Sequence, residues 1–109
     1  MQPKIDVEEV SRAVKAALAG LYGDRLEKVI LYGSYARGDF HEESDIDFLV
    51  VLRDEKVRTG QEIRAMGPVI FPVQLHFGVY LSTHPMSRKQ LEESDFSFVE
   101  NVRREGVLL

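Results

Sequence analysis

The stretch 29-VILYGSYARGDFHEESDIDFLVVL-52 contains the residues that decide the fold. At its ends, residues 29–32 and 48–52 form short apolar runs, rich in β-branched and aromatic side chains and bordered by Gly, Ser and Asp. Runs of this length and composition are typical of buried strands. We therefore expect two strands, joined by a polar segment that carries the chemistry.

The first expected strand ends in Gly33-Ser34, and residues 35–37 are expected to form a short helical turn. A bend from a strand into such a turn leaves backbone N–H groups pointing forward, which is an arrangement that binds phosphate. Gly33 has no Cβ to keep a phosphate away from the main chain, and the Ser34 hydroxyl adds a donor. Gly33 and Ser34 are therefore candidate nucleotide-binding residues.

The second expected strand begins with Asp45 and Asp47, which lie two positions apart. The period of a strand puts both carboxylates on one face, with Cα atoms roughly 6–7 Å apart. Two like charges so close are unfavourable unless a cation lies between them. A Gly-Ser or an Asp-x-Asp alone is more often a turn or a solvated loop. Together, between two strands, they indicate a phosphate ligand bound through metal ions.

These residues carry a resemblance to a known family. The sequences GS at 33–34, ARG at 36–38 and SDID at 44–47, followed by an apolar strand, resemble the signature of the minimal nucleotidyltransferases, small members of the DNA polymerase β superfamily. Residues 98–107 also resemble the end of that family. The resemblance implies a nucleotidyltransferase fold in which Asp45 and Asp47 hold the catalytic metal ions while the Gly-Ser turn holds the β- and γ-phosphates.

The chemistry expected of such a site is nucleotidyl transfer. Paired divalent cations about 3.5–4 Å apart hold attacking and leaving oxygens in line, and Mg²⁺ prefers carboxylate and phosphate oxygens. We expect two Mg²⁺ ions at Asp45 and Asp47, with Mn²⁺ as an alternative, and ATP or another nucleoside triphosphate as substrate. Arg37 is either a further donor to a phosphate or an ordinary surface arginine.

The composition sets the outer limits of this interpretation. With 109 residues, 44% of them hydrophobic, the chain is expected to form one soluble domain over residues 1–109. It has no cysteine, and His41, His76 and His84 are too scattered for a zinc site and are expected on the surface. The lack of a long apolar run predicts a cytoplasmic protein without membrane spans. The net charge of −4 argues against non-specific binding to nucleic acid.

The segments around these two strands predict mostly helices. Asp6 is expected to cap a helix that stops at Gly23. A second helix is expected to begin at residues 54–56, to end or kink at residues 67–68, and to bury three apolar side chains. Those three are Ile63, Met66 and Ile70.

Residues 73–81 alternate between apolar and polar side chains, which predicts a half-exposed third strand. Residues 82–85 are expected to form a turn, Ser87 to cap a short helix, and Asp95 to cap the last helix. A small mixed β-sheet with helices packed against it is an α/β (α+β) fold. The nucleotidyltransferase fold implied by the resemblance agrees with this prediction.

One departure from the family pattern concerns catalysis. The resemblance implies a third carboxylate from a later strand, but residues 73–81 contain no Asp or Glu. Gln74 or His76 lies where that acid is expected. Each is either a substitute, as a neutral ligand or an imidazole base, or an ordinary exposed residue. Binding of nucleotide and metal is therefore better supported than turnover.

Two functions from different classes remain open. The resemblance implies pairing with a small helical HEPN-type protein encoded alongside, with this chain as the antitoxin that adenylylates its toxin. The alternative is a catalytically degenerate nucleotide-binding module that neutralises or regulates its partner by contact. The apolar residues Phe96, Phe98 and Val99 and residues 107–109 either close the core or form a docking patch, and a homo-oligomer is left open.

Overall fold

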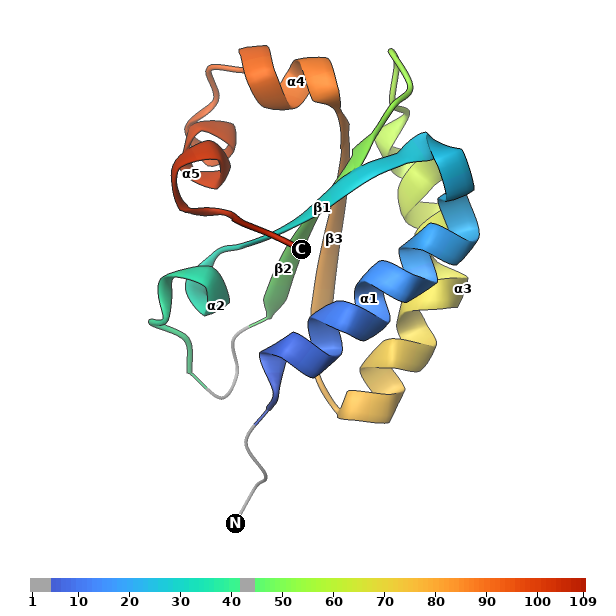
Figure 1. The fold of residues 1–109 in the computed structure, drawn as a ribbon, viewed down its shortest axis with the longest axis vertical. Coiled ribbons are helices and arrows are strands. Elements are labelled where there is room, and N and C mark those ends of the chain that lie inside the picture. Colours follow the sequence, from blue (N-terminus) through green and yellow to red (C-terminus); the bar gives the residue numbers. More distant parts are fainter. Residues whose placement is uncertain (1–4, 42–44) are drawn as a thin grey trace.

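The fold is a four-stranded mixed sheet with helices on both faces (Figure 1). The computed structural model describes residues 5–41 and 45–109. The strands lie in the order β3-β2-β1-β4, with β1 antiparallel to both of its neighbours and β2 parallel to β3. Their bounds are Leu26–Tyr32 for β1, Ile46–Leu52 for β2, Leu81–Ser87 for β3 and Val107–Leu108 for β4. This is the α/β class predicted from the sequence.

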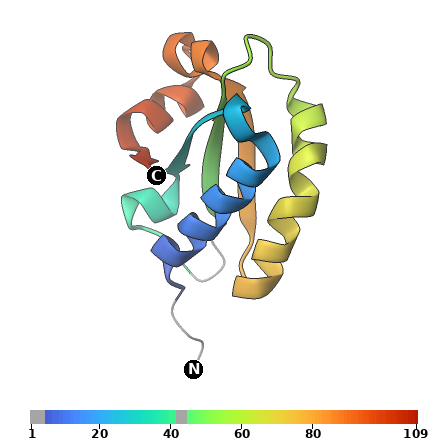
Figure 2. The ribbon, with the colours of Figure 1, turned by 45° about the vertical axis from the view of Figure 1, so that its right-hand side comes forward.

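Two long helices cover one face of the sheet and two short ones the other (Figures 1 and 2). The long pair is α1 (Val7–Tyr22) and α3 (Thr59–Phe77), and the short pair is α4 (Arg88–Glu93) and α5 (Ser97–Glu105). A single turn of helix, α2 (Ser34–Arg37), follows β1. Among the described residues, no helix combines the length and apolarity that a membrane span requires.

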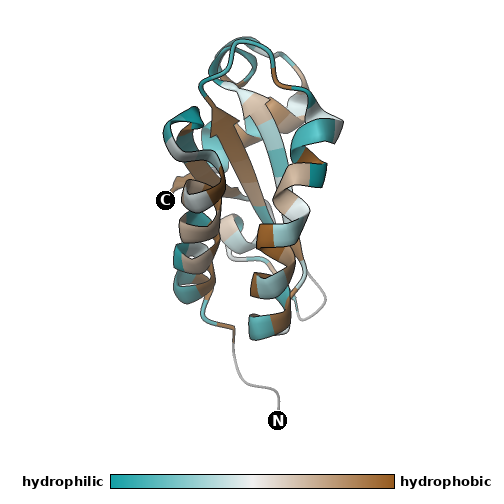
Figure 3. Cartoon of the chain, turned by 90° about the vertical axis from the view of Figure 1, so that its right-hand side faces the viewer, coloured by the Kyte–Doolittle hydropathy of each residue, from teal (hydrophilic) through white to brown (hydrophobic). Residues whose placement is uncertain are grey.

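The two central strands are buried on both faces over residues 29–31 and 48–52, which explains why these parts of their sequences are apolar without interruption. Phe48 and Val50 pack toward α1 and α3, whereas Leu49 and Val51 pack toward α4 and α5. In Figure 3, which is coloured by hydropathy, one strand between the long helices is brown along most of its length, while the neighbouring strand is paler. The strands expected at residues 29–32 and 48–52 are confirmed, each with a few more residues at its start.

Helix α1 begins and ends where the sequence predicts. The Asp6 carboxylate accepts hydrogen bonds from the N–H groups of Glu8 and Glu9, at 3.1 and 3.2 Å. Gly23 ends the helix with φ of 54°, in the region that glycine enters most easily. Its N–H bonds to the carbonyl of Ala19.

Helix α3 differs from its prediction at both ends. It begins at Thr59 and continues through Pro68 and Pro72 to Phe77, so the predicted end or kink at residues 67–68 is wrong. Each proline leaves one carbonyl of the preceding turn without its helical donor. Both prolines lie on the exposed side of the helix, where water can satisfy that carbonyl. Burial of the opposite side keeps the helix intact.

The buried side of α3 is partly as predicted. Met66 and Ile70 are buried, but Ile63 is 47% exposed. Glu62 is the buried residue in that turn, and its carboxylate accepts hydrogen bonds from the Tyr22 hydroxyl at 3.2 Å and from Arg25 at 2.7 Å. A buried acid satisfied by two donors is therefore part of the packing between α1 and α3.

The third strand lies later in the chain than expected. Residues 73–77 belong to α3, so the predicted strand at residues 73–81 is wrong, and residues 82–85 form part of β3 instead of a turn. Gly78, with φ of 66°, ends α3. Because β3 is an edge strand, Pro85 is tolerated within it.

The last two helices are close to their predictions. Ser87 caps α4 through a reciprocal capping box with Gln90, as its position in the sequence predicts. Helix α5 is also present, but it starts at Ser97 after Phe96, so the predicted cap by Asp95 is wrong.

Candidate functional site

The bend between β1 and α2 forms one wall of the site. Gly33 adopts φ of 77°, and its carbonyl accepts hydrogen bonds from the N–H groups of Ala36 and Arg37, each at 3.1 Å. The leading N–H groups of a helical turn have no acceptor within the turn. The bend therefore presents main-chain donors beside the Ser34 side chain, as the sequence predicts.

The Asp47 carboxylate lies directly against this bend. The antiparallel register pairs Tyr32, the last residue of β1, with Asp47 in β2. A Cβ atom at Gly33 would lie 3.2 Å from the carboxylate carbon of Asp47 and still closer to its Oδ2. Glycine is thus required at this position both by its backbone conformation and by the approach of the acid.

The two acids form an electrostatically strained pair. Asp45 is exposed just before β2, and Asp47 is half-buried at its start. Burial raises the pKa of the Asp47 carboxyl above its ordinary value, the charge of Asp45 raises it further, and Arg37 lowers it. Two neighbouring carboxylates, one of which is disfavoured in its ionised form by burial and by the charge of the other, offer hard oxygen donors that fit a divalent cation.

The other side of Asp47 is formed by side chains of β3. The parallel register places Ser82 beside Asp47 and His84 beside Leu49, so both β3 side chains share the face of Asp47. Tyr32 shares the same face from β1, and its hydroxyl is hydrogen-bonded to Ser82. Burial and the negative charge of Asp47 raise the pKa of Tyr32 to about 12, so Tyr32 stays protonated at neutral pH.

Phe98 of α5 packs against this face. Its ring meets the ring of Tyr32 edge-on at 5.4 Å and the ring of His84 edge-on at 5.3 Å. Burial lowers the pKa of His84, which favours a neutral imidazole. His84 was expected on the surface, but it lies half-buried near the site.

Gln74 and His76 do not lie on the strand beside Asp47, so their predicted placement there is wrong. Both are in α3: Gln74 accepts a hydrogen bond from the Leu81 N–H at 2.8 Å, and His76 is exposed with its ring edge-on to Phe77. The β3 side chains on the face of Asp47 are Ser82 and His84.

The strand beside Asp47 still lacks a third acid, although the residues on it are not the ones predicted. Strand β3 has no Asp or Glu, and the described part of the chain contains no group of three or more metal-binding side chains. The signals that point to β3 in the sequence are weak. Gly78 marks the end of a helix, and the polar residues 82–84 fit a half-covered edge strand.

Arg37 lies at the C-terminal end of α2, near the two acids. Its guanidinium is paired with Asp39 at 3.1 Å and with Glu105 of α5 at 3.5 Å, and these carboxylates raise its pKa. Exposed ion pairs such as these contribute little to stability, so Arg37 can leave them at small cost to contact a phosphate, and a structural role also fits its position. A hollow of about 260 Å³, lined in part by Gly33, Arg37 and Phe98, separates the bend from α5.

Comparison with known proteins agrees with this geometry. The pattern of the nucleotidyltransferase domain family matches residues 9–107. A relative from Methanocaldococcus jannaschii named "Putative protein adenylyltransferase" is 30% identical over 103 residues, which cover 94% of this chain and 98% of the relative.

Solved structures share the fold at lower sequence identity. One described as "Structure of putative minimal nucleotidyltransferase" has a TM-score of 0.62 at 22% identity, covering 99% of this chain and 100% of its own. Another, described as "Crystal structure of the toxin-antitoxin with AMP-PNP", has a TM-score of 0.64 at 18% identity, covering 89% and 69%. The chain belongs to the nucleotidyltransferase domain family and has the fold of a minimal nucleotidyltransferase.

Proposed function

We propose that the protein transfers AMP from ATP to a hydroxyl group of a protein partner. The observation that carries this proposal is the contact between the phosphate-binding bend at Gly33 and the Asp47 carboxylate. Membership of the nucleotidyltransferase family supports the reaction class. The name of the relative from M. jannaschii, a protein adenylyltransferase, supports AMP as the group and a protein as the acceptor.

The chain's own residues have distinct roles in this reaction. The main-chain donors of the bend and the Ser34 hydroxyl hold the β- and γ-phosphates, and Arg37 adds a positive charge at their edge. Asp45 and Asp47 would hold two Mg²⁺ ions, or Mn²⁺ in their place. When bound, such ions neutralise the negative charge on the phosphoryl oxygens and on the leaving pyrophosphate.

The partner we propose is a small helical HEPN-type protein, with this chain as the antitoxin of the pair in the cytoplasm. The signature at residues 33–47 supports this pairing, as does the likeness to a structure described as a toxin-antitoxin. Transfer of AMP to a hydroxyl of the toxin would be the means of neutralisation.

A second candidate function is neutralisation by contact alone. The observation that favours it is the lack of a carboxylate on β3, where Ser82 and His84 face the site. In that case the bend and the two acids still bind nucleotide, but no AMP is transferred to the partner.

The intact mass of the partner distinguishes the two candidate functions. Purified chain, ATP, Mg²⁺ and the partner encoded alongside are incubated together, and the partner's intact mass is measured. The proposal expects the added mass of AMP with wild type, its loss with Asp45→Asn, and its retention with the matched control Asp24→Asn, which is exposed and distant in the sequence. If Asp45→Asn and Asp47→Asn neutralise the toxin as well as wild type does, neutralisation does not depend on transfer.

A further inference from the structure

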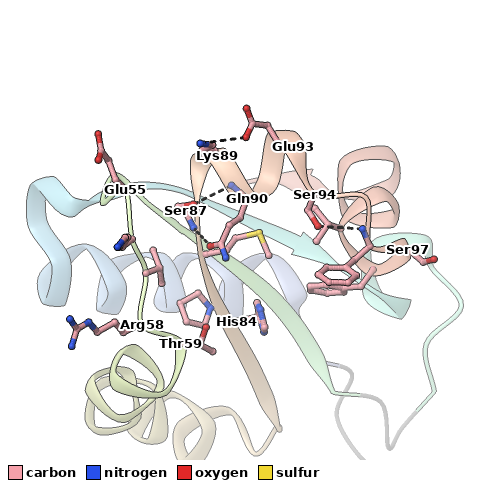
Figure 4. A pocket seen from close by; sticks show the side chains of 17 residues that line it. Glu55, Arg58, Thr59, His84, Ser87, Lys89, Gln90, Glu93, Ser94 and Ser97 are labelled. Carbon is pink, nitrogen blue, oxygen red and sulfur yellow. Dashed lines mark hydrogen bonds and ion pairs between the residues drawn. The ribbon is translucent and has the colours of Figure 1, made fainter.

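A large cavity lies at the β3 edge of the sheet, where it begins at His84 and Phe98 of the candidate site and extends toward the carboxyl end of β3 (Figure 4). Its volume is about 1060 Å³, and it is bounded by residues 55–59, the second half of β3, α4 and residues 96–99. Figure 4 shows His84 between Thr59 on one side and the segment that carries Ser94 and Ser97 on the other. Neither Asp45 nor Asp47 lines this cavity.

The order of the strands indicates which of the two substrates approaches Asp47 from the β3 side. The phosphate-binding bend follows β1, the acids begin β2, and β3 lies on the far side of β2. In a displacement at phosphorus, the attacking oxygen enters opposite the leaving oxygen. If the leaving pyrophosphate is held at the bend on the β1 side, as proposed above, an attacking hydroxyl opposite to it comes from the β3 side of Asp47.

The cavity is connected to the acids by two side chains. His84 and Phe98 both line it, and their rings are in contact at 5.3 Å. Phe98 also contacts Tyr32, which pairs with Asp47 across the sheet. A chain lying in the cavity therefore reaches the carboxylates by passing the His84–Phe98 pair.

We propose that this cavity holds the segment of the partner polypeptide that carries the acceptor hydroxyl, which presupposes the proposed transfer of AMP to a protein. His84 and Phe98 act as positioning residues that direct the hydroxyl toward the site. The cavity is large enough for several side chains of an extended segment.

The lining of the cavity defines the chemistry of that segment. It contains the cations Lys56, Arg58 and Lys89 and the carboxylates Glu55 and Glu93, a balance of +1 in a chain whose net charge is −4. Lys89 is paired with Glu93 at 4.0 Å, whereas the described residues offer Lys56 and Arg58 no ion pair.

Two further features add to this selectivity. The start of α3 at Thr59, which no side chain caps, adds positive partial charge to the same wall. Apolar side chains, including Met86 and the 75%-exposed Phe96, form the opposite side. The acceptor hydroxyl is therefore flanked by a carboxylate and by an apolar or aromatic residue.

Kinetics with the intact partner tests this assignment. The double variant Lys56→Glu/Arg58→Glu reverses the unpaired charge at the exposed rim, and Ser97→Trp adds bulk at another exposed position on the rim of the cavity. Initial rates of AMP transfer are measured as a function of partner concentration, and ATP binding is measured separately by calorimetry. Arg12→Glu, on the exposed side of α1, is the control for a change of charge elsewhere.

The expected result is a rise of about tenfold or more in KM for the partner in both cavity variants, because opposing charge and lost volume weaken docking. The affinity of both cavity variants for ATP should match that of wild type, and Arg12→Glu should have the wild-type KM for the partner. If wild type transfers AMP to its partner and both cavity variants keep its KM, this assignment is overturned and the proposed function stands. If wild type transfers no AMP, the proposed function fails and the assignment fails with it.

Discussion

On the β1 side of Asp47 the site consists mainly of main chain, whereas on the β3 side it consists of side chains. The bend at Gly33 depends on a backbone conformation with φ of 77° and on the absence of a Cβ atom. Ser82 and His84 reach the same face only because β3 pairs with β2 in a particular register. The side proposed to hold phosphate is thus set by local geometry, and the side proposed to hold the acceptor by long-range pairing.

This difference has a chemical meaning. Every nucleoside triphosphate presents the same phosphates, so one main-chain arrangement serves all of them. Acceptors differ from one another, and side chains on an edge strand can change without altering the fold. Substitutions can test whether the β1 side of Asp47 binds the phosphates and the β3 side binds the acceptor.

The largest effect is expected from Asp47→Asn, because Asp47 lies between the bend on the β1 side and the β3 side chains. The amide keeps the shape of the side chain but removes the charge that would hold metal ions. AMP transfer should fall by about a thousandfold, measured as the initial rate of mass gain by the partner. Transfer at more than a tenth of the wild-type rate would show that Asp47 is not at the centre of the site.

The next largest effect is expected on the β1 side, from Gly33→Ala. The new Cβ would collide with the Asp47 carboxylate, and the backbone conformation of φ 77° and ψ −156°, which only glycine adopts readily, would cost about 1–3 kcal/mol in addition. ATP affinity should fall by roughly a hundredfold, a loss of the size expected when several charge-assisted hydrogen bonds to phosphate are disturbed. Titration calorimetry with a non-hydrolysable ATP analogue measures the change.

Gly38→Ala is the matched control for that variant. Gly38 has φ of 83°, but a Cβ atom there would meet nothing within 4 Å. It should therefore lose only the stability that the positive φ costs, without the cost of a collision, and keep its affinity for ATP. Equal losses of ATP affinity in both variants would mean that the contact between Gly33 and Asp47 has no special role.

The sequence predicts the β1 side well because its signals are local. Residues 29–52 carry the glycine, the acids and the flanking apolar runs within one hairpin-like unit, and the pairing of β1 with β2 then brings them together. The capped ends of α1 and α4 are predicted for the same reason, since Asp6 and Ser87 bond to the turn that follows them.

The β3 side escapes prediction because its signals conflict. Alternation over residues 73–81 is typical of a strand, yet burial of Met66 and Ile70 against the sheet extends α3 through two prolines. Strand β3 itself, with Ser82, His84 and Pro85, has little apolar alternation because it lies at the edge and is only half-covered. Its position depends on pairing with β2, which no short segment encodes.

A gain of activity is expected on the β3 side from Ser82→Asp. Because Ser82 lies beside Asp47, the new carboxylate would supply the third acid that β3 lacks. The maximal rate of AMP transfer should rise by about a hundredfold, the lower end of what one positioned general base contributes. Ser82→Asn, whose side chain has the shape of Asp without its charge, should not increase this rate. An increase in both variants would point to loss of the Tyr32 hydrogen bond as the cause.

The smallest effect is expected on stability, where Asp47 and Asp54 should behave in opposite ways. Burial and Asp45 raise the pKa of Asp47 in the folded chain, so ionising it destabilises the fold as pH rises through that pKa. The hydrogen bond from Arg25 lowers the pKa of Asp54, so its ionised form stabilises the fold at neutral pH and that contribution is lost as pH falls.

In a chelating buffer at neutral pH, Asp47→Asn should therefore raise the melting temperature by roughly 2 °C and Asp54→Asn should lower it by a similar amount. The Asp47 difference should shrink as pH falls through the raised pKa of Asp47 and vanish below the ordinary carboxyl value of 3.8, whereas the Asp54 difference should shrink only below 3.8, as pH falls through the lowered pKa of Asp54. Added Mg²⁺ should then stabilise wild type and Asp54→Asn but not Asp47→Asn, because only a chain that binds the ion gains stability from it. Equal stabilisation of all three chains by Mg²⁺ would place the ion away from Asp47 and remove the centre on which both sides of the site depend.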